Sequence, residues 1–220
     1  IGAVVNGSFR VPAANFIIED GALKNIGQRY DENGLVWTAE SMVPFTLMLC
    51  ESHLENPSNL PVAVFSHGGT RTRADVISYA ASNCLQGVAS FSIDLPFHAG
   101  RAFPVALPDQ NLVAAGGVDN YNQFIGKAPG DEGYVPDHVS DGAGAVEAVG
   151  NLLGINFNFD PAIAEANTIG YILDTYVALR HLTENDWSQF LPGLSFNGDA
   201  IFQQANSFGS TLTLGLSALT

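Results

Sequence analysis

Basic residues are scarce in this sequence. Its 220 residues include 8 Lys and Arg against 22 Asp and Glu, which gives a formal net charge of −14 at pH 7. Such a surface repels phosphate backbones and anionic lipid headgroups at long range, so we expect no nucleic acid as a partner. The acidity also suits a soluble protein outside the cell, and we expect a secreted or cell-envelope location.

Long apolar runs are missing and cysteines are few. No stretch approaches the roughly 20 apolar residues that span a bilayer, and no basic-then-apolar signal segment opens the chain. The chain starts at Ile1 instead of Met, so we expect a processed or excised polypeptide. Cys50 and Cys84 are too few for a disulfide scaffold and leave two alternatives open: one bridge, or two buried thiols that pack as small apolar side chains.

Residues 61–93 carry the clearest structural pattern. The apolar run 61–66 is typical of a strand buried on both faces, and it ends in a His-Gly-Gly turn. Apolar residues then recur at helical spacing over 76–85, and Gly87 stands where a helix cap belongs. A second apolar run fills 88–93. Strand, helix and strand with short links predict a parallel crossover unit, and hence an α/β fold with a doubly wound, mostly parallel sheet.

The pattern on either side of this unit is weaker. Strands are predicted at 4–10 and 42–50, with a loop at 19–34 between them. Residues 103–159 are rich in Gly, Asn, Asp and Pro and predict a long insert or lid-like region of the same domain. Pro161 opens a helix with one expected apolar face: Ile163, Ala166, Ile169, Leu173, Tyr176 and Leu179. A strand at 199–204 and an apolar helix at 211–219 follow.

The segment Ala205-Asn206-Ser207-Phe208-Gly209 has the form small-x-Ser-x-small between that strand and that helix. A nucleophile elbow needs small residues two positions before and after the serine, because the backbones approach closely there. Such a turn holds the serine hydroxyl at the tip of the turn. We therefore predict Ser207 as a catalytic nucleophile, with Ala205 and Gly209 as the small elbow residues; the alternative is a serine in an ordinary turn.

Acyl transfer also needs two backbone N–H groups that stabilise the developing oxyanion. The residue after the nucleophile supplies one in this type of site, here Phe208. The other comes from the loop after an earlier strand, for which Gly69 is the first candidate and Thr70 the next. We expect His67 to pack or to bond to backbone instead of serving as the base.

Three segments together resemble the α/β-hydrolase superfamily, above all secreted bacterial lipases and esterases. They are Phe65-Ser66-His67-Gly68-Gly69, the stretch from Ser92 to Arg101, and the elbow. The resemblance covers about 42–219 and departs from the family at Ala205, where Gly is commoner, and in the polar pair Gln203-Gln204. It implies a carboxylic-ester hydrolase that uses no cofactor and no metal, acting on an acyl ester or lipid.

In that family the triad runs Ser, then Asp or Glu, then His along the chain. No Asp, Glu or His follows Ser207, so the resemblance implies an N-terminal portion, incomplete on its C-terminal side, with acid and base in a second fragment or missing segment. His98, or His138 in its acidic setting Asp137-His138-Val139-Ser140-Asp141, is the alternative base, and the same setting is a weaker metal candidate. His53 and His181 are expected at the surface. A peptidase or other acyl hydrolase, or a non-catalytic binding domain, remain alternative functions.

Overall fold

The structure is a computed structural model. It describes residues 1–12, 16–19, 22–25, 28–31, 34–37, 40–69, 71–96, 98, 101, 128, 131 and 161–216, and the statements below concern those residues. The predicted insert at 103–159 lies outside them apart from two positions. The predicted candidates Thr70, Asp137, His138 and Asp141 lie outside them as well.

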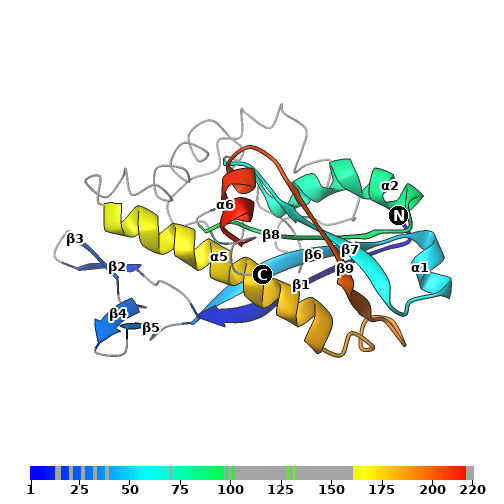
Figure 1. Cartoon of the computed structure of the whole chain (residues 1–220), viewed down its shortest axis with the longest axis horizontal. Coiled ribbons are helices and arrows are strands. Elements are labelled where there is room, and N and C mark those ends of the chain that lie inside the picture. Colours follow the sequence, from blue (N-terminus) through cyan, green and yellow to red (C-terminus); the bar gives the residue numbers. More distant parts are fainter. Residues whose placement is uncertain are drawn as a thin grey trace.

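A five-stranded mixed sheet forms the centre of an α/β fold (Figure 1). The strand order is β1-β6-β8-β7-β9, with β1 Ala3–Pro12, β6 Glu40–Leu49, β8 Ala89–Ile93, β7 Leu60–Ser66 and β9 Phe196–Ala205. β7 pairs in parallel with β8 and β9, while β6 pairs antiparallel with β1 and β8. The parallel crossover predicted for 61–93 is confirmed. The described sheet is mixed, not mostly parallel, because β1 and β6 form an antiparallel pair at one side.

Residues between β1 and β6 contain two small hairpins instead of the predicted loop. β2 (Phe16–Glu19) pairs with β3 (Ala22–Asn25), and β4 (Gln28–Asp31) pairs with β5 (Gly34–Trp37), each antiparallel. A four-residue strand offers only two positions to each face, too few for its alternation to be recognised in a sequence. The loop predicted for 19–34 was therefore wrong.

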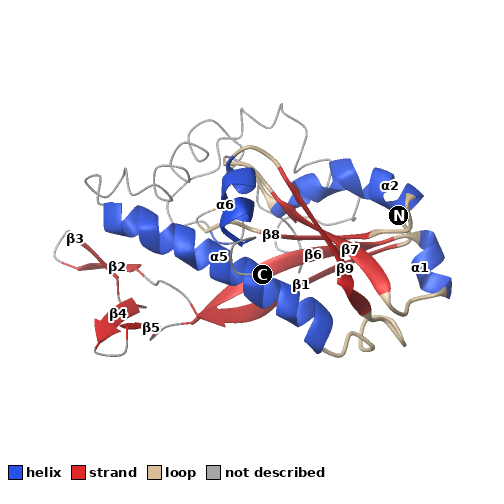
Figure 2. Cartoon of the chain, in the orientation of Figure 1, coloured by secondary structure: helices blue, strands red, loops and turns tan. Residues whose placement is uncertain are grey.

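Helices lie on both faces of the sheet (Figure 2). The described helices are α1 (Glu51–Glu55), α2 (Ile77–Leu85) after the 3₁₀ turn η1 (Arg73–Val76), α5 (Pro161–Glu184) and α6 (Phe208–Leu216). Consecutive residues of β7 identify the faces, because neighbouring strand side chains point to opposite sides. The Phe65 ring packs on Tyr79 of α2 at 4.7 Å between centroids, whereas Ser66 Oγ accepts a hydrogen bond from Tyr171 of α5 at 2.6 Å. α2 and α5 therefore sandwich the sheet.

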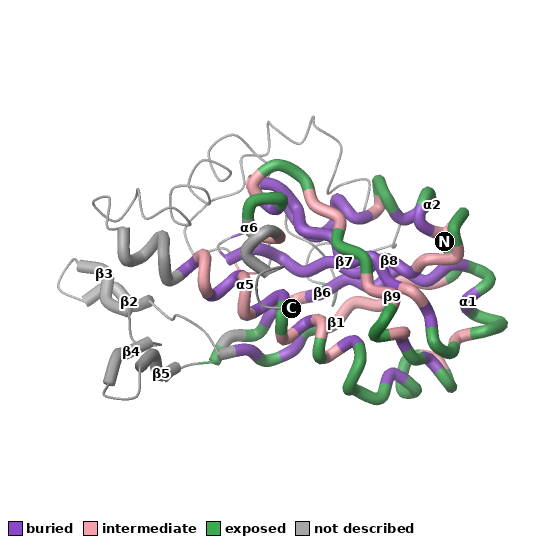
Figure 3. The backbone as a smooth tube through the Cα atoms, in the orientation of Figure 1, coloured by how far each residue is buried: buried purple, intermediate pink, exposed green. Residues whose placement is uncertain are grey.

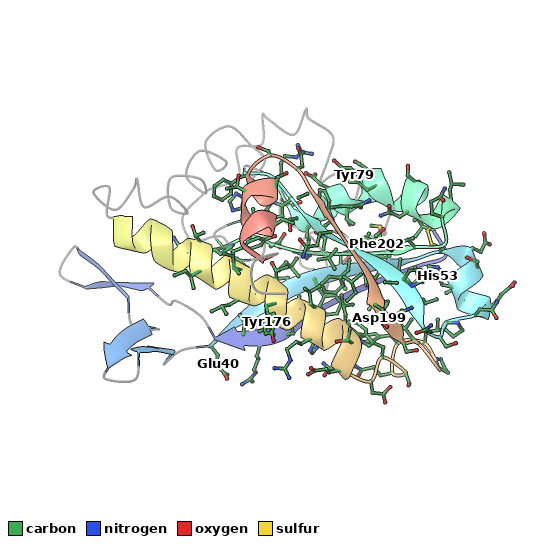
Figure 4. All side chains as sticks on the ribbon, viewed as in Figure 1. Glu40, His53, Tyr79, Tyr176, Asp199 and Phe202 are labelled. Atoms are coloured by element: carbon green, nitrogen blue, oxygen red, sulfur yellow. A yellow bond between two sulfur atoms is a disulfide. The ribbon has the colours of Figure 1, made fainter. Side chains whose placement is uncertain are left out.

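The buried core runs along β6, β7 and β8, and exposure increases at β9 (Figure 3). β9 is the edge strand of the described sheet, and its Phe202 is 51% exposed (Figure 4). The polar Gln204 of this strand has a structural reason. Its side-chain amide exchanges two hydrogen bonds with Asn83 of α2, at 3.0 and 2.9 Å, so the strand is fixed to the helix behind it.

The buried face of α5 differs from the predicted one. The described buried residues are Asn167, Gly170, Tyr171, Asp174, Thr175, Ala178 and Leu182. Tyr176, which the apolar spacing assigned to the interior, is 38% exposed. Of the other predicted residues, Ile169, Leu173 and Leu179 are half-buried, while the side chains of Ile163 and Ala166 lie outside the described ones. The prediction was therefore wrong at Tyr176, and it missed the polar residues of the inner face.

α2 ends as its sequence predicts. Gly87 adopts φ +69°, its N–H donates to Cys84 O, and the Val88 N–H donates to Asn83 O, each at 3.0 Å. This pair of bonds is the Schellman termination, which favours glycine at the left-handed position. It also turns the chain directly into β8.

Cys50 and Cys84 form a disulfide that links the N-terminus of α1 to the last turn of α2. The bridge alternative is therefore the one that the structure contains.

Because the bond closes a segment with a sequence separation of 34, we expect Cys50→Ala/Cys84→Ala to lower the free energy of unfolding by about 3–4 kcal/mol. Urea unfolding with and without reductant measures this. Reductant should destabilise the unsubstituted protein and leave the doubly substituted protein unchanged. Equal stability of the unsubstituted protein with and without reductant would contradict the prediction.

Candidate active site

Ser207 occupies a sharp strand-to-helix turn. β9 ends at Ala205 and α6 begins at Phe208. Ser207 has φ +51°, and among the described residues Asn59 is the other non-glycine residue with positive φ. This backbone conformation costs an L-residue about 1–2 kcal/mol. The turn is held by the Asn206 N–H, which donates to Ser66 O at 3.0 Å, and it leaves Ser207 exposed.

The residue two positions after Ser207 has no room for a side chain. A Cβ on Gly209 would lie 2.4 Å from Ser66 O and 2.5 Å from His67 O, both backbone atoms. Ala205, two positions before the serine, lies opposite Ser66 in the parallel ladder, where its methyl group is accommodated. The start of α6 therefore packs directly on the end of β7, the close approach for which the small residues were predicted.

The His-Gly-Gly turn lies beside Ser207. A Cβ built on Gly68 would lie 3.1 Å from Ser207 Cβ and 3.7 Å from its Oγ. The N–H groups of the two predicted oxyanion residues, Gly69 and Phe208, have no hydrogen-bond acceptor within the described part of the chain. Phe208 is the first residue of α6, where helix N–H groups lack an intrahelical partner. Phe208 directly follows Ser207, and Gly69 directly follows the Gly68 that lies beside that serine.

His67 is bonded to backbone on both ring nitrogens, as expected for a histidine that is not the base. Its Nε2 accepts the Leu95 N–H at 2.9 Å, and its Nδ1 lies 2.7 Å from Gly68 O. Burial, assisted by the nearby His98, lowers the pKa of His67 well below its usual value. The imidazole is therefore neutral at physiological pH.

The other described histidines do not hydrogen-bond to Ser207 either. His53 was expected at the surface and is buried instead: Nδ1 accepts the Cys50 N–H at 3.2 Å, and Nε2 lies 2.9 Å from Gly87 O (Figure 4). His98 is buried with Nδ1 2.9 Å from Pro96 O, and His181 is half-buried against Phe9 and Trp187. Among the described residues, no imidazole or carboxylate is hydrogen-bonded to Ser207 Oγ.

Two buried ion pairs brace the loops that follow β7 and β8. The Arg73 guanidinium donates to Asp94, whose other oxygen accepts the Arg73 N–H at 2.8 Å. Arg101 Nη1 donates to Asp174 of α5 at 2.5 Å and to Asp94 O at 3.1 Å. Burial raises the pKa of Asp174, and the Arg101 guanidinium opposes that rise. These pairs could not be predicted from the sequence, because the partners are 21 and 73 positions apart in the chain.

The buried histidines predict an acid-sensitive fold. Burial lowers the pKa of both His67 and His98, so the unfolded chain binds protons from about pH 6.5 downward while the folded chain does not. The free energy of unfolding should fall with pH below that value, by up to about 1.4 kcal/mol per pH unit for each of the two. Urea unfolding between pH 7.5 and 5.5, above most carboxylate titration, measures the slope. His98→Asn should make it shallower, and an unchanged slope in that variant would contradict the assignment.

A cavity of about 200 Å³ lies apart from the serine. It opens between β1 and the residues after α5 and is lined by Gly7, Ser8, Phe45, His181, Asn185, Asp186, Trp187, Gln189 and Phe190. None of these residues belongs to the elbow or to the His-Gly-Gly turn.

In the described ranges, no group of three or more His, Cys, Asp or Glu side chains could hold a metal ion, and none of the helices there has the length and apolar character to span a membrane.

Comparison with known proteins gives a distant structural resemblance to esterases. No family model and no curated protein sequence matches the chain. A PEG-bound complex of a novel cold-adapted esterase from an Arctic intertidal metagenomic library is similar, with 13% identity and a TM-score of 0.40 over 98% of this chain and 56% of that one. A zinc-bound structure of a novel cold-adapted esterase from an Arctic intertidal metagenomic library gives 12% identity and a TM-score of 0.38, over 98% of this chain and 54% of that one.

A third similar structure is a ferulic acid esterase, with 10% identity and a TM-score of 0.24 over 97% of this chain and 94% of that one. The chain spans about half the length of the two cold-adapted esterase structures. The class that the fold defines is an α/β protein with a five-stranded mixed sheet in the described part of the chain.

Proposed function

We propose that this chain carries the nucleophile and the oxyanion donors of a serine carboxylic-ester hydrolase of the α/β-hydrolase type, a lipase or esterase. The observation that carries the proposal is Ser207 at φ +51° in a strand–turn–helix junction, exposed and beside Gly68. An ordinary turn has no need of a strained serine at its tip, and glycine or asparagine would adopt this backbone at lower cost.

In the proposed reaction, Ser207 Oγ attacks the acyl carbon of the ester while a base takes its proton. The carbonyl oxygen becomes an oxyanion that accepts hydrogen bonds from the N–H groups of Gly69 and Phe208. The tetrahedral intermediate then collapses, the proton passes to the departing alcohol oxygen, and water later hydrolyses the acyl-enzyme. Each preorganised donor of this kind contributes about 10²–10³-fold to kcat.

We propose that the catalytic acid and histidine come from polypeptide outside these 220 residues. The described histidines hydrogen-bond to backbone or pack elsewhere, which supports an external base. β9, the strand that leads to Ser207, is the edge of the described sheet, so a further strand has a place to pair. We also propose an extracytoplasmic location, which the Cys50–Cys84 disulfide supports because such bonds persist in oxidising compartments.

A fluorophosphonate probe tests the function on the full-length protein. The probe should label one serine, and peptide mass spectrometry should identify that residue as Ser207. Chromogenic esters of rising chain length then separate a lipase from a short-chain esterase, and a peptide substrate tests the peptidase alternative. A folded, full-length protein that is neither labelled at Ser207 nor active on esters would contradict the proposal and favour a non-catalytic domain.

A further inference from the structure

His67 lies buried under the turn that carries the proposed oxyanion donor Gly69. Its Nε2 accepts the Leu95 N–H at 2.9 Å, so in the neutral ring this nitrogen carries no hydrogen. The hydrogen is then on Nδ1, which donates to Gly68 O at 2.7 Å. The Leu95 amide, at the end of the neighbouring strand β8, thus selects the tautomer that bonds to the turn.

The bond to Gly68 O has a consequence for the next amide. The Gly68 carbonyl and the Gly69 N–H belong to one planar trans peptide unit, in which they point in opposite directions. The same carbonyl accepts the Arg71 N–H at 3.3 Å, so two donors hold it. Fixing the carbonyl fixes the direction of the Gly69 N–H on the other side of the peptide.

This peptide unit lies next to the nucleophile. The Cα of Gly68 faces Ser207, since a Cβ built on it would come within 3.1 Å of Ser207 Cβ. An N–H group that must stabilise an oxyanion acts most strongly when it is oriented before the reaction and does not reorient during it. A glycine peptide has the backbone freedom to rotate unless something holds it.

We propose that His67 is a positioning residue, which holds the Gly68–Gly69 peptide so that the Gly69 N–H is aimed at the oxyanion above Ser207. This inference rests on the proposed esterase function. His67 touches neither substrate nor nucleophile in this role; it acts through the peptide. Because the Leu95 N–H donates to Nε2, that nitrogen carries no hydrogen, and the imidazole stays in the one tautomer whose Nδ1–H can bond to Gly68 O.

Two variants of His67 separate the two ring nitrogens. The Asn side-chain amide nitrogen can replace Nδ1, so His67→Asn can retain the bond to Gly68 O while losing the bond from Leu95. In His67→Gln the side-chain oxygen can replace Nε2, so the bond from Leu95 is retained and the bond to Gly68 O is lost. We expect His67→Gln to lower kcat on a chromogenic ester about 10²-fold with KM nearly unchanged, and His67→Asn to restore kcat to within about tenfold of the unsubstituted protein.

His53→Gln provides the matched control, because His53 is also buried and bonded to backbone but lies at α1 (Figure 4). It should show a comparable change in thermal stability and an unchanged kcat. Equal losses of kcat in His67→Asn and His67→Gln, or losses confined to KM, would overturn the positioning role.

A measurement without variants covers the case in which His67→Gln fails to fold. ¹⁵N chemical shifts of the full-length protein should show His67 as the neutral Nδ1–H tautomer, and an Nε2–H tautomer or an imidazolium at pH 7.5 would overturn the inference. Absence of fluorophosphonate labelling at Ser207 in the unsubstituted protein would instead contradict the esterase function itself, so the two failures are distinguishable.

Discussion

Ser207→Gly is expected to abolish ester hydrolysis and at the same time to make the fold more stable. Loss of the nucleophile in a serine hydrolase lowers kcat by about 10⁴-fold or more. The backbone of Ser207, at φ +51°, is one that glycine adopts without strain. Relief of about 1–2 kcal/mol of strain outweighs the extra chain entropy that glycine loses on folding, so we expect a net gain of about 0.5–1 kcal/mol.

Ser207→Ala separates the two effects. Alanine removes the hydroxyl and keeps the strained backbone, so activity should be lost while the free energy of unfolding stays within about 0.5 kcal/mol of the original value. Ester hydrolysis and urea unfolding of both variants measure the pair of effects. A stable but still active Ser207→Ala variant would show that the turn is not the catalytic elbow.

Asn59→Gly is the matched control for the backbone effect. Asn59 has φ 58° in the turn before β7, and it is the other described non-glycine residue in this region of backbone space. Asparagine tolerates the left-handed conformation better than serine does, so a smaller stability change is expected. Activity should be unaffected, because this turn lies at the opposite end of β7 from the elbow.

Features that depend on a few consecutive residues could be predicted from the sequence. The run 61–66 is buried almost throughout, which is why its apolar composition marked it as a central strand. Gly87 was recognisable because the helix end requires a left-handed residue, and the φ of +69° agrees. The sharp turn between β9 and α6 followed from the same kind of reasoning, since only small residues fit beside a tight strand-to-helix turn.

Features that depend on partners distant in sequence could not be predicted. Tyr171 and Ser66, whose hydroxyls meet behind the elbow, are 105 positions apart, and Asn83 and Gln204 are 121 apart. A polar residue in a single sequence carries no sign of the residue that will satisfy it. In the sequence, Gln204 is therefore only an unusually polar residue for a strand. In the structure, it fixes that strand to α2.

Two predictions from the sequence were wrong for the same reason: the surface position of His53 and the inner face of α5. Histidine in a short helix and polar residues along a long helix are usually exposed. His53 is buried because two backbone groups near the disulfide give it partners, and Asp174 is buried because Arg101 reaches it from the loop after β8. Sequence periodicity measures the apolar side of a helix and misses a face that is buried through hydrogen bonds.

Gly209→Ala is expected to be among the most damaging single-methyl substitutions in the chain. The new Cβ would lie 2.4 Å from Ser66 O and 2.5 Å from His67 O, and neither atom can move without moving the end of β7. Overpacking against backbone costs more than overpacking against a flexible side chain. We expect the free energy of unfolding to fall by about 2–4 kcal/mol, measured by urea unfolding.

Gly170→Ala is the matched control, since a Cβ at Gly170 in α5 meets no atom within 4 Å. Alanine in a helix interior should stabilise the fold by about 0.5–1 kcal/mol relative to glycine. If Gly209→Ala were tolerated as well as Gly170→Ala, the close contact between α6 and β7 would be absent.

The effect of Gly209→Ala on catalysis follows from the two segments that must separate, the end of β7 and the start of α6. Ser66 and His67 precede the turn that carries Gly69, while Gly209 follows Ser207 by two residues. Relief of the clash should therefore move Ser207 away from Gly69, the proposed oxyanion donor on the other segment. In a variant that still folds, kcat should fall about 10²-fold or more, because a shift of about 1 Å between catalytic groups has an effect of that size. A folded Gly209→Ala protein with full activity would mean that the spacing between these two segments does not matter for the reaction.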